Sequence, residues 1–335
     1  MDKYRLLYVL VLSCVTTVLP AQLKDYSSQV DSVLNLMTIQ EKVGQMIQYS
    51  NNKLLTGPAL DTSNRTEEIK RGEVGSVFNI ITVERAKQYQ DLAMQSRLRI
   101  PLLFGLDVLH GLKTIFPIPL AEAASFNLDL MRKTANVAAA ETSSLGIHWT
   151  FAPMVDVSRD ARWGRSMEGA GEDTWYGSQA AKARIEGFQG SNYDEKRTVL
   201  ACAKHFAAYG AAVGGRDYAE ADISEHTLQQ VYLPPFQAAV EAGVATFMNA
   251  FNEINGIPAT AHKILQRDVL KGKWQSWLSR IILDEKLDHK HSIFTEKKLI
   301  IALVVTEADP STAAGDYFTA MEFAGSLEKA GYEIK

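Results

Sequence analysis

Short apolar runs alternate with longer helix-like stretches along most of this chain, and this alternation constrains the fold more than any other feature. The strand-like runs are residues 74–80, 101–106, 147–152, 199–205 and 244–251. The helix-like stretches are residues 83–96, 128–144, 174–188 and 225–242. Strands that alternate with helices at this spacing are typical of a parallel sheet, and more than four such units favour a barrel over a small open sheet. The sequence therefore predicts an α/β fold of the (β/α)8 TIM type.

Composition excludes several classes of protein. With 335 residues and 46% hydrophobic content, the chain can bury one large core, with or without a small appendage. Its net charge of −4 gives no indication of nucleic-acid binding or of attraction to an anionic membrane surface. The two cysteines are Cys14 in an N-terminal apolar segment and Cys202 in a predicted buried strand. We therefore predict no structural disulfide and a core position for Cys202.

The first 21 residues have the pattern of an export signal. Lys3 and Arg5 supply the positive start, residues 6–18 are apolar, and cleavage is expected after Ala21. The apolar run is too short for a stable membrane span. A weak lipoprotein-like box ends at Cys14, so lipidation at this cysteine stays open as an alternative. The sequence predicts a periplasmic or secreted protein.

Polar residues follow two of the predicted strands at the point where each strand ends. Asp107 comes directly after the run 101–106, and Lys204 and His205 end the run 199–205. The C-terminal ends of the strands form the active face of a parallel barrel. An acid, an amine and an imidazole at one mouth offer fixed acceptors and donors for hydroxyl groups. This pattern predicts a site for a polyhydroxylated ligand.

Four sequence blocks, in order, carry a family resemblance. They are GLDVLHGLKTIFPIPLAEAAS (105–125), IHWTFAPMVDVSRDARWGRSMEGAGED (147–173), ACAKHFAAYG (201–210) and VATFMNAFNEINGIPAT (244–260). From about residue 36 to residue 274 the chain resembles the N-terminal barrel domain of glycoside hydrolase family 3, of the periplasmic β-glucosidase type. The resemblance implies a barrel domain at residues 22–274 and retaining hydrolysis of terminal, non-reducing β-D-glucosyl residues. Phe206 is followed by AAYG and not by the Pro-Gly-His-Gly loop of the N-acetylhexosaminidase branch, so the glucosidase branch is the better match.

The resemblance also implies the residues that bind the sugar. Asp107 accepts hydrogen bonds from two hydroxyls, while Arg165, Lys204 and His205 donate to others. The remaining implied substrate-binding residues form the floor, wall and entrance of the pocket: Met248, Phe251 and Arg216. Plainer interpretations stay open, because Asp107 can cap a helix, Lys204 and His205 can stabilise the rim as a salt-bridged pair, and Met248 can be a core residue. Trp163, Arg159 and Arg162 are interpreted as structural.

The family pattern is lost after Trp274. Members that resemble this chain place the nucleophilic Asp in a Ser-Asp-Trp segment soon after this point, and no such segment follows here. Asp284 ends the short apolar run 281–283 and is the one candidate for a substitute nucleophile. The acid/base Glu of such members comes from a second, C-terminal domain. We therefore expect an incomplete barrel with impaired catalysis.

Residues 275–335 form a predicted non-family tail. An apolar run at 299–305 and a helix-like stretch at 316–330 make a partial β-α unit that weakly resembles the start of a glycosyltransferase. Two alternatives to a β-glucosidase follow. The chain is an inactive, truncated sugar-binding remnant fused to a glycosyltransferase fragment, or it is a glycosyltransferase-like enzyme defined by its tail.

Metal and cofactor sites are not predicted. The seven histidines are scattered, and His289 and His291 lie in a charged stretch without ligand spacing. The expected partner is a β-glucoside or oligosaccharide substrate, with no nucleic acid. The sequence leaves open the preferred linkage, the aglycone and the oligomeric state.

Overall fold

The computed structural model describes residues 27–51, 65–190 and 197–274. The predicted signal peptide, Cys14, Asp284 and the predicted tail lie outside these described residues. All statements below concern the described part of the chain.

The strands run parallel in chain order. Four of them form one sheet in the order β1-β2-β3-β4: Gln48–Ser50, Ser76–Phe78, Leu103–Leu106 and Trp149–Thr150. The next two, β5 (Cys202–Phe206) and β6 (Thr246–Asn249), pair in parallel as well. Isolated parallel bridges join Trp149 to Leu200 and Met154 to Lys204, so β5 continues the sheet beyond β4. This arrangement confirms the α/β fold with parallel strands.

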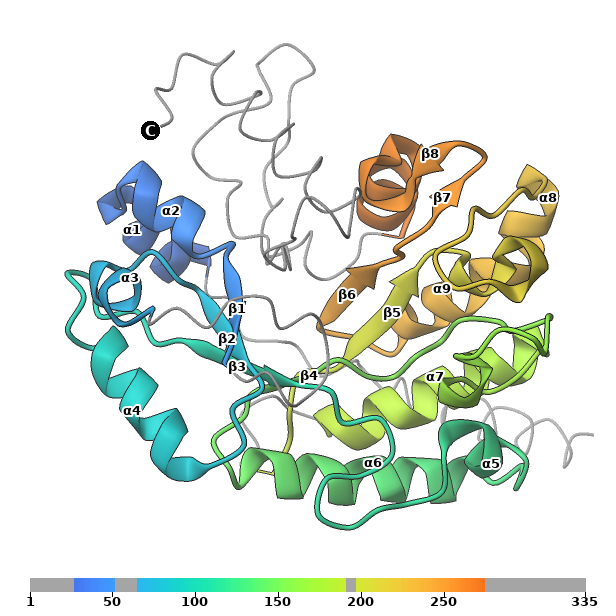
Figure 1. The fold of residues 1–335 in the computed structure, drawn as a ribbon, viewed down its shortest axis with the longest axis horizontal. Coiled ribbons are helices and arrows are strands. Elements are labelled where there is room, and N and C mark those ends of the chain that lie inside the picture. Colours follow the sequence, from blue (N-terminus) through green and yellow to red (C-terminus); the bar gives the residue numbers. More distant parts are fainter. Residues whose placement is uncertain (1–26, 52–64, 191–196, 275–335) are drawn as a thin grey trace, which may run out of the picture.

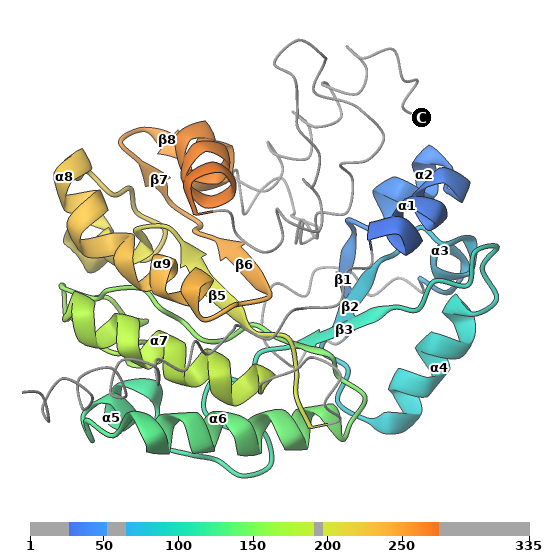
Figure 2. The ribbon, with the colours of Figure 1, turned by 180° about the vertical axis from the view of Figure 1, so that it is seen from behind.

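The longer helices lie on the outer side of the strands (Figure 1, and from behind in Figure 2). They are α4 (Val83–Ala93), α6 (Leu128–Ser143), α7 (Thr174–Gln189) and α9 (Pro234–Glu241). Shorter helices stand before or between them: α1 (Ser27–Leu36), α2 (Ile39–Gly44), α3 (Thr66–Arg71), α5 (Pro119–Ala123) and α8 (Glu225–Thr227). Three of the predicted helices are therefore confirmed, with ends within a few residues of those expected.

The single helix predicted over residues 225–242 is wrong. The segment is divided into α8, a π-helical turn at Leu228–Tyr232, and α9. Pro234 and Pro235 explain the division, because a proline lacks the N–H that continues a helix and its ring clashes with the preceding turn. A proline at the first helical position is favourable, so α9 begins there instead.

Three elements of the structure were not predicted from the sequence. The first strand, β1, reads Gln-Tyr-Ser and has no apolar run to reveal it. A two-stranded antiparallel hairpin of β7 (Glu253–Ile254) and β8 (Ile257–Pro258) follows β6. A π-helix at Ile264–Lys273 ends the described part of the chain.

The sheet buries side chains on both faces, as expected for parallel strands covered by helices. On the helix side, Val77 and Phe104 pack with Ile69 and Ala86 from α3 and α4. A second cluster joins residues of β2, β4 and β5 and the segment after β4: Phe78, Trp149, Phe151 and Cys202. Cys202 is fully buried, and burial raises the pKa of its thiol to about 12. Its predicted core position is confirmed.

A buried ion pair fastens the segment after β3 to the helical layer. Arg184 of α7 donates to Glu122 of α5 over 2.5 Å and also donates to the carbonyl oxygen of Leu109. Both charged side chains are almost completely buried, and burial lowers the pKa of Arg184. Leu109 lies two residues after Asp107, so this pair restrains the segment that carries a predicted ligand-binding carboxylate.

Replacement of Arg184 by leucine is expected to lower the free energy of unfolding by about 3–5 kcal/mol, because Glu122 is then left as a buried charge without its partner. Urea denaturation measures the change. Lys182→Leu on the same helix is the matched control, since its pair with Glu241 is solvent-exposed and is worth less than about 1 kcal/mol. Equal losses for the two variants would contradict the role assigned to Arg184.

Candidate active site

Asp107 and Lys204 meet at the C-terminal ends of β3 and β5. The Nζ atom of Lys204 lies 2.9 Å from Oδ1 of Asp107. The lysine side chain is 4% exposed and the aspartate side chain 17% exposed, so the pair is largely shielded from water. Asp107 does not cap a helix, since the next helix, α5, has Ile118 at its N-cap. The pair leaves acceptor capacity on the carboxylate and donor capacity on the amine for a ligand.

His205 pairs with a different acid, Asp156, which the sequence analysis did not identify. The Nδ1 atom and the backbone nitrogen of His205 each lie 2.8 Å from Oδ2 of Asp156. Asp156 stands within a buried run after β4, and this acid in an otherwise apolar segment is the signal that could have revealed it. Lys204 and His205 are therefore not paired with each other but each with an acid from another strand end.

A bulge in β5 explains how adjacent residues reach different partners. Lys204 pairs with Met248 of β6 and Phe206 pairs with Asn249, so His205 is the extra residue of the longer strand. A bulge of this kind re-aims a side chain and is over-represented next to active sites. Here it allows Lys204 to contact Asp107 while His205 contacts Asp156.

The Asp156–His205 pair is buried, and burial shifts both groups toward their neutral forms. Burial raises the pKa of Asp156 to about 7, against the opposing effect of the hydrogen bond from the backbone of His205. Burial, followed by the positive charges of Lys204 and Arg165, lowers the pKa of His205 well below its usual value. Both changes follow from the cost of charge in a low-dielectric site.

Arg165 is held in a fixed orientation by Glu168. Its Nε and Nη2 atoms donate to the two carboxylate oxygens of Glu168 over 2.7 and 2.9 Å. The guanidinium also lies 5.6 Å from the ring centroid of Tyr209. Arg162, interpreted as structural, is exposed and pairs with Asp160 over 2.7 Å. Glu168 therefore orients the predicted sugar-binding arginine.

Aromatic residues surround His205. The centroid of its ring lies 5.1 Å from that of Tyr209 and 5.3 Å from that of Phe251. Phe251 is 40% exposed and stands next to Tyr218, which is 65% exposed. Trp163 is buried and donates to Asp217, in line with its interpretation as a packing residue. Tyr209 and Tyr218 were not identified from the sequence.

Two further predicted ligand-binding residues are Met248, which lies opposite Lys204 in the β5–β6 register, and Arg216. Met248 is half-buried and packs against the interior cluster of Phe78, Trp149, Phe151 and Cys202, which agrees with the alternative that it is a core residue. Arg216 is exposed, and its Nε atom lies 3.5 Å from the carbonyl oxygen of Val213 in the same loop. The structure thus pairs Asp107 with Lys204, places Phe251 beside His205, and puts Met248 opposite Lys204 in the neighbouring strand.

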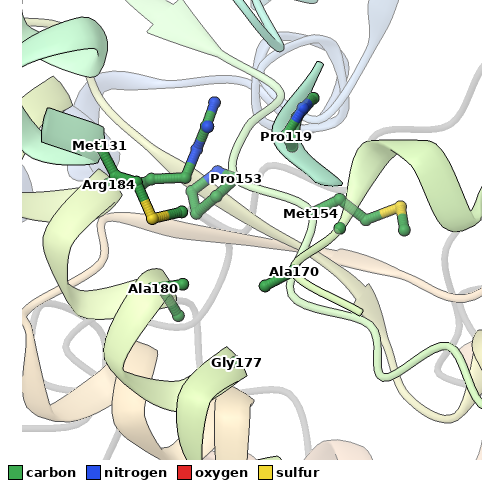
Figure 3. A pocket seen from close by; sticks show the side chains of 10 residues that line it. Pro119, Met131, Pro153, Met154, Ala170, Gly177, Ala180 and Arg184 are labelled. Carbon is green, nitrogen blue, oxygen red and sulfur yellow. The ribbon is translucent and has the colours of Figure 1, made fainter. Parts of the chain in front are cut away.

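A small pocket lies elsewhere, between α6, α7 and the segment after β4 (Figure 3). Its lining is mostly apolar and contains none of the predicted sugar-binding residues: Pro119, Met131, Pro153, Met154, Gly169, Ala170, Gly177, Ala180, Ala181 and Arg184. Within the described ranges, no group of three or more His, Cys, Asp or Glu side chains is placed to hold a metal ion. No described helix combines the length and apolar character that a membrane crossing requires.

The sequence and structure are similar to known glycosidases. The family profile described as "Glycosyl hydrolase family 3 N terminal domain" matches residues 38–295, a range that includes Asp284. The periplasmic β-glucosidase of Salmonella typhimurium is 44% identical over 246 residues, which cover 73% of this chain and 32% of that protein. The lysosomal β-glucosidase of Dictyostelium discoideum is 31% identical and covers 73% of this chain and 34% of that protein. The chain therefore spans about a third of the length of these curated relatives.

A solved structure shows the same arrangement. The β-glucosidase of Listeria innocua, in complex with isofagomine, superposes with a TM-score of 0.69 at 42% identity. The superposition covers 74% of this chain and 35% of that protein.

The Asp156–His205 pair predicts opposite pH dependences for two variants. In Asp156→Asn, His205 is protonated below pH ~6.5 in the unfolded chain but stays neutral in the native state. The free energy of unfolding therefore falls by about 1.4 kcal/mol for each pH unit below this value. In His205→Gln, native Asp156 binds a proton below a pKa of about 7, whereas the unfolded chain does so only near ~3.9. Stability then rises as the pH falls between these values.

Urea denaturation of both variants at pH 5, 6, 7 and 8 measures these slopes relative to the unsubstituted protein, in which the two effects largely cancel. Referring each variant to the parent at the same pH removes the contribution of other titrating groups. Parallel slopes for the two variants would contradict the assignment of the proton to this pair.

Proposed function

The chain belongs to glycosyl hydrolase family 3, and we propose that it acts as a β-glucosidase-type glycoside hydrolase on terminal, non-reducing β-D-glucosyl residues. The observation that carries the proposal is the Asp107–Lys204 pair at the ends of β3 and β5, 2.9 Å apart and largely shielded from water. A carboxylate and an amine fixed beside each other can accept from and donate to neighbouring hydroxyls of one sugar ring.

We propose that β1 to β6 and their helices are part of a TIM-type (β/α)8 barrel at residues 22–274. The parallel, chain-ordered strands with helices on their outer side support this. Residues 275–335 were expected to form a separate tail, but the family profile continues to residue 295. We therefore propose that the first part of this range, which contains Asp284, belongs to the family region and that the partial β-α unit at residues 299–330 forms the tail.

In the proposed mechanism, the described residues bind and orient the sugar. Asp107 accepts hydrogen bonds from ring hydroxyls, and Lys204, His205 and Arg165 donate to others. The partners of these side chains fix their orientation before the sugar arrives, which lowers the entropic cost of binding. Phe251 supplies an apolar wall, Met248 the floor, and Arg216 the entrance.

The proposed nucleophile is Asp284. A retaining glycosidase needs a carboxylate that attacks the anomeric carbon and a second carboxyl group that acts as acid and then as base. Asp284 ends a short apolar run, as a residue at the mouth of a barrel would. The chain has no Ser-Asp-Trp segment after Trp274, and this observation favours a second candidate function, binding of a β-glucoside without turnover.

The proposed location is the periplasm or the exterior of the cell, reached through the signal peptide at residues 1–21. The periplasmic relative in Salmonella typhimurium supports it. Lipidation at Cys14 is the alternative anchor. The proposed partner is a β-glucoside or oligosaccharide, and a related β-glucosidase has been solved in complex with glucose.

Release of nitrophenol from p-nitrophenyl β-glucoside by the purified chain without residues 1–21 tests the function. Turnover is expected to fall about 10- to 100-fold in kcat/KM for Asp107→Asn, because a hydrogen bond to a charged group is worth roughly 1.5–3 kcal/mol. Asp284→Asn is expected to abolish turnover while glucose still binds. Asp160→Asn, on an exposed pair, serves as the control with unchanged kinetics.

The outcomes separate the two candidate functions. Turnover that is lost in Asp284→Asn supports the hydrolase, whereas glucose binding without turnover in a folded sample supports the binding protein. Unchanged turnover in Asp107→Asn would overturn the proposed site.

A further inference from the structure

Asp156 is a buried acid that none of the predicted sugar contacts uses. Its side chain is 1% exposed, and its Oδ1 atom has no hydrogen-bond partner in the described structure. Its Oδ2 atom faces two nitrogens of a single residue, the backbone nitrogen and Nδ1 of His205, each at 2.8 Å. A buried carboxyl group directed at one side chain in this way is expected to control that side chain.

The contacts of Asp156 determine which nitrogen of His205 is available to a ligand. Nδ1 is occupied by Asp156, so any hydrogen bond from the imidazole to a sugar hydroxyl passes through Nε2. Tyr209 and Phe251 pack against the ring at 5.1 and 5.3 Å and restrict its rotation. The imidazole therefore has one orientation and one free nitrogen.

The position of protons in the pair decides what Nε2 can do. One proton lies between Oδ2 and Nδ1. Without it, a lone pair on the oxygen would face a lone pair on the nitrogen, and two buried acceptors would be in contact without a hydrogen bond. Nε2 is a donor in two states of the pair. In one, the ring carries protons on both nitrogens and the carboxylate is charged. In the other, the carboxyl group is protonated and the neutral ring carries its proton on Nε2. If the carboxylate is charged and the ring is neutral with its proton on Nδ1, Nε2 is an acceptor.

The charged groups around the pair are themselves matched. Lys204 beside it pairs with Asp107, and Arg165 pairs with Glu168. Asp217, from the loop after β5, accepts from Trp163. The two cations that act on Asp156 are thus each balanced by a carboxylate, and burial outweighs their remaining effect and favours the protonated form of Asp156.

We propose that Asp156 is a positioning residue for the proposed function, which orients His205 and keeps its Nε2 protonated as a hydrogen-bond donor to one hydroxyl of the bound sugar. Replacement by asparagine tests this sharply. The backbone N–H of His205 requires an oxygen at the position of Oδ2, so the asparagine oxygen lies there and also accepts from Nδ1. The neutral ring then carries its proton on Nδ1, and Nε2 becomes an acceptor.

Nitrogen-15 NMR of histidine-labelled protein at pH 6 reads this directly, with His205→Gln used to assign the His205 signals. We expect a protonated Nε2 in the unsubstituted protein and an unprotonated Nε2 in Asp156→Asn. An unprotonated Nε2 in the unsubstituted protein overturns the proposal without reliance on any variant. Asp160→Asn, four residues further along the same segment, is the control and should leave the His205 signals unchanged.

Calorimetric binding of glucose and of its monodeoxy analogues at pH 6 provides the second measurement. Asp156→Asn is expected to bind glucose about tenfold more weakly than the unsubstituted protein. For the deoxyglucose that lacks the hydroxyl contacted by Nε2, the two proteins are expected to have the same affinity. Uniform weakening for every analogue would show a merely structural role and overturn the proposal. If the unsubstituted protein binds no glucose, the proposed function and the sugar contact both fail, while the NMR result still decides whether Asp156 sets the protonation of His205.

Discussion

A charged or hydrogen-bonding side chain buried at the end of a strand requires a partner, and this requirement determines the arrangement of the candidate site. Lys204 and His205 are adjacent and nearly fully buried, so neither can rely on water. Leaving the buried charge of Lys204 without a partner costs several kcal/mol. Leaving the polar ring nitrogen of His205 without a hydrogen bond costs about 1–3 kcal/mol. The carboxyl groups that satisfy them come from two other strand ends, Asp107 after β3 and Asp156 after β4. Three neighbouring strand ends are thereby bound to each other through the residues proposed to hold the sugar.

The same requirement extends outward into the scaffold. The carboxylate of Asp107 has a defined position only if the segment after β3 is held in place. Arg184 holds this segment, because it donates to the carbonyl oxygen of Leu109 while it is paired with Glu122. Arg165 is likewise fixed by both oxygens of Glu168. Side chains held in this way do not have to be ordered when a ligand binds, so less of the interaction energy is lost to entropy. Stability of the fold and geometry of the site therefore depend on the same ion pairs.

The sequence revealed what depends on local pattern and missed what depends on pairing in space. Apolar runs and helical stretches gave the parallel order of β2 to β6 and the helices α4, α6 and α7, because those patterns are local. The polar strand β1 has no such pattern, and the break at Pro234 was overlooked. Lys204 and His205 were found from their position after an apolar run. Asp107 was found in the same way, although its pairing with Lys204 was not. Asp156 was missed because it is 49 residues away from His205 and only the folded chain brings the two together.

The pairing also restricts which carboxyl groups can perform the chemistry. A retaining nucleophile must be a charged carboxylate with a free oxygen directed at the anomeric carbon. Asp107 is already paired with Lys204, and burial beside His205 favours the protonated form of Asp156. Neither acid suits attack, and both suit binding or support of binding. The described strand ends therefore fit the proposed binding of the sugar, and we look for the nucleophile in another part of the chain. Asp284 lies within the family match, which is why its substitution, and not that of Asp107, separates turnover from binding.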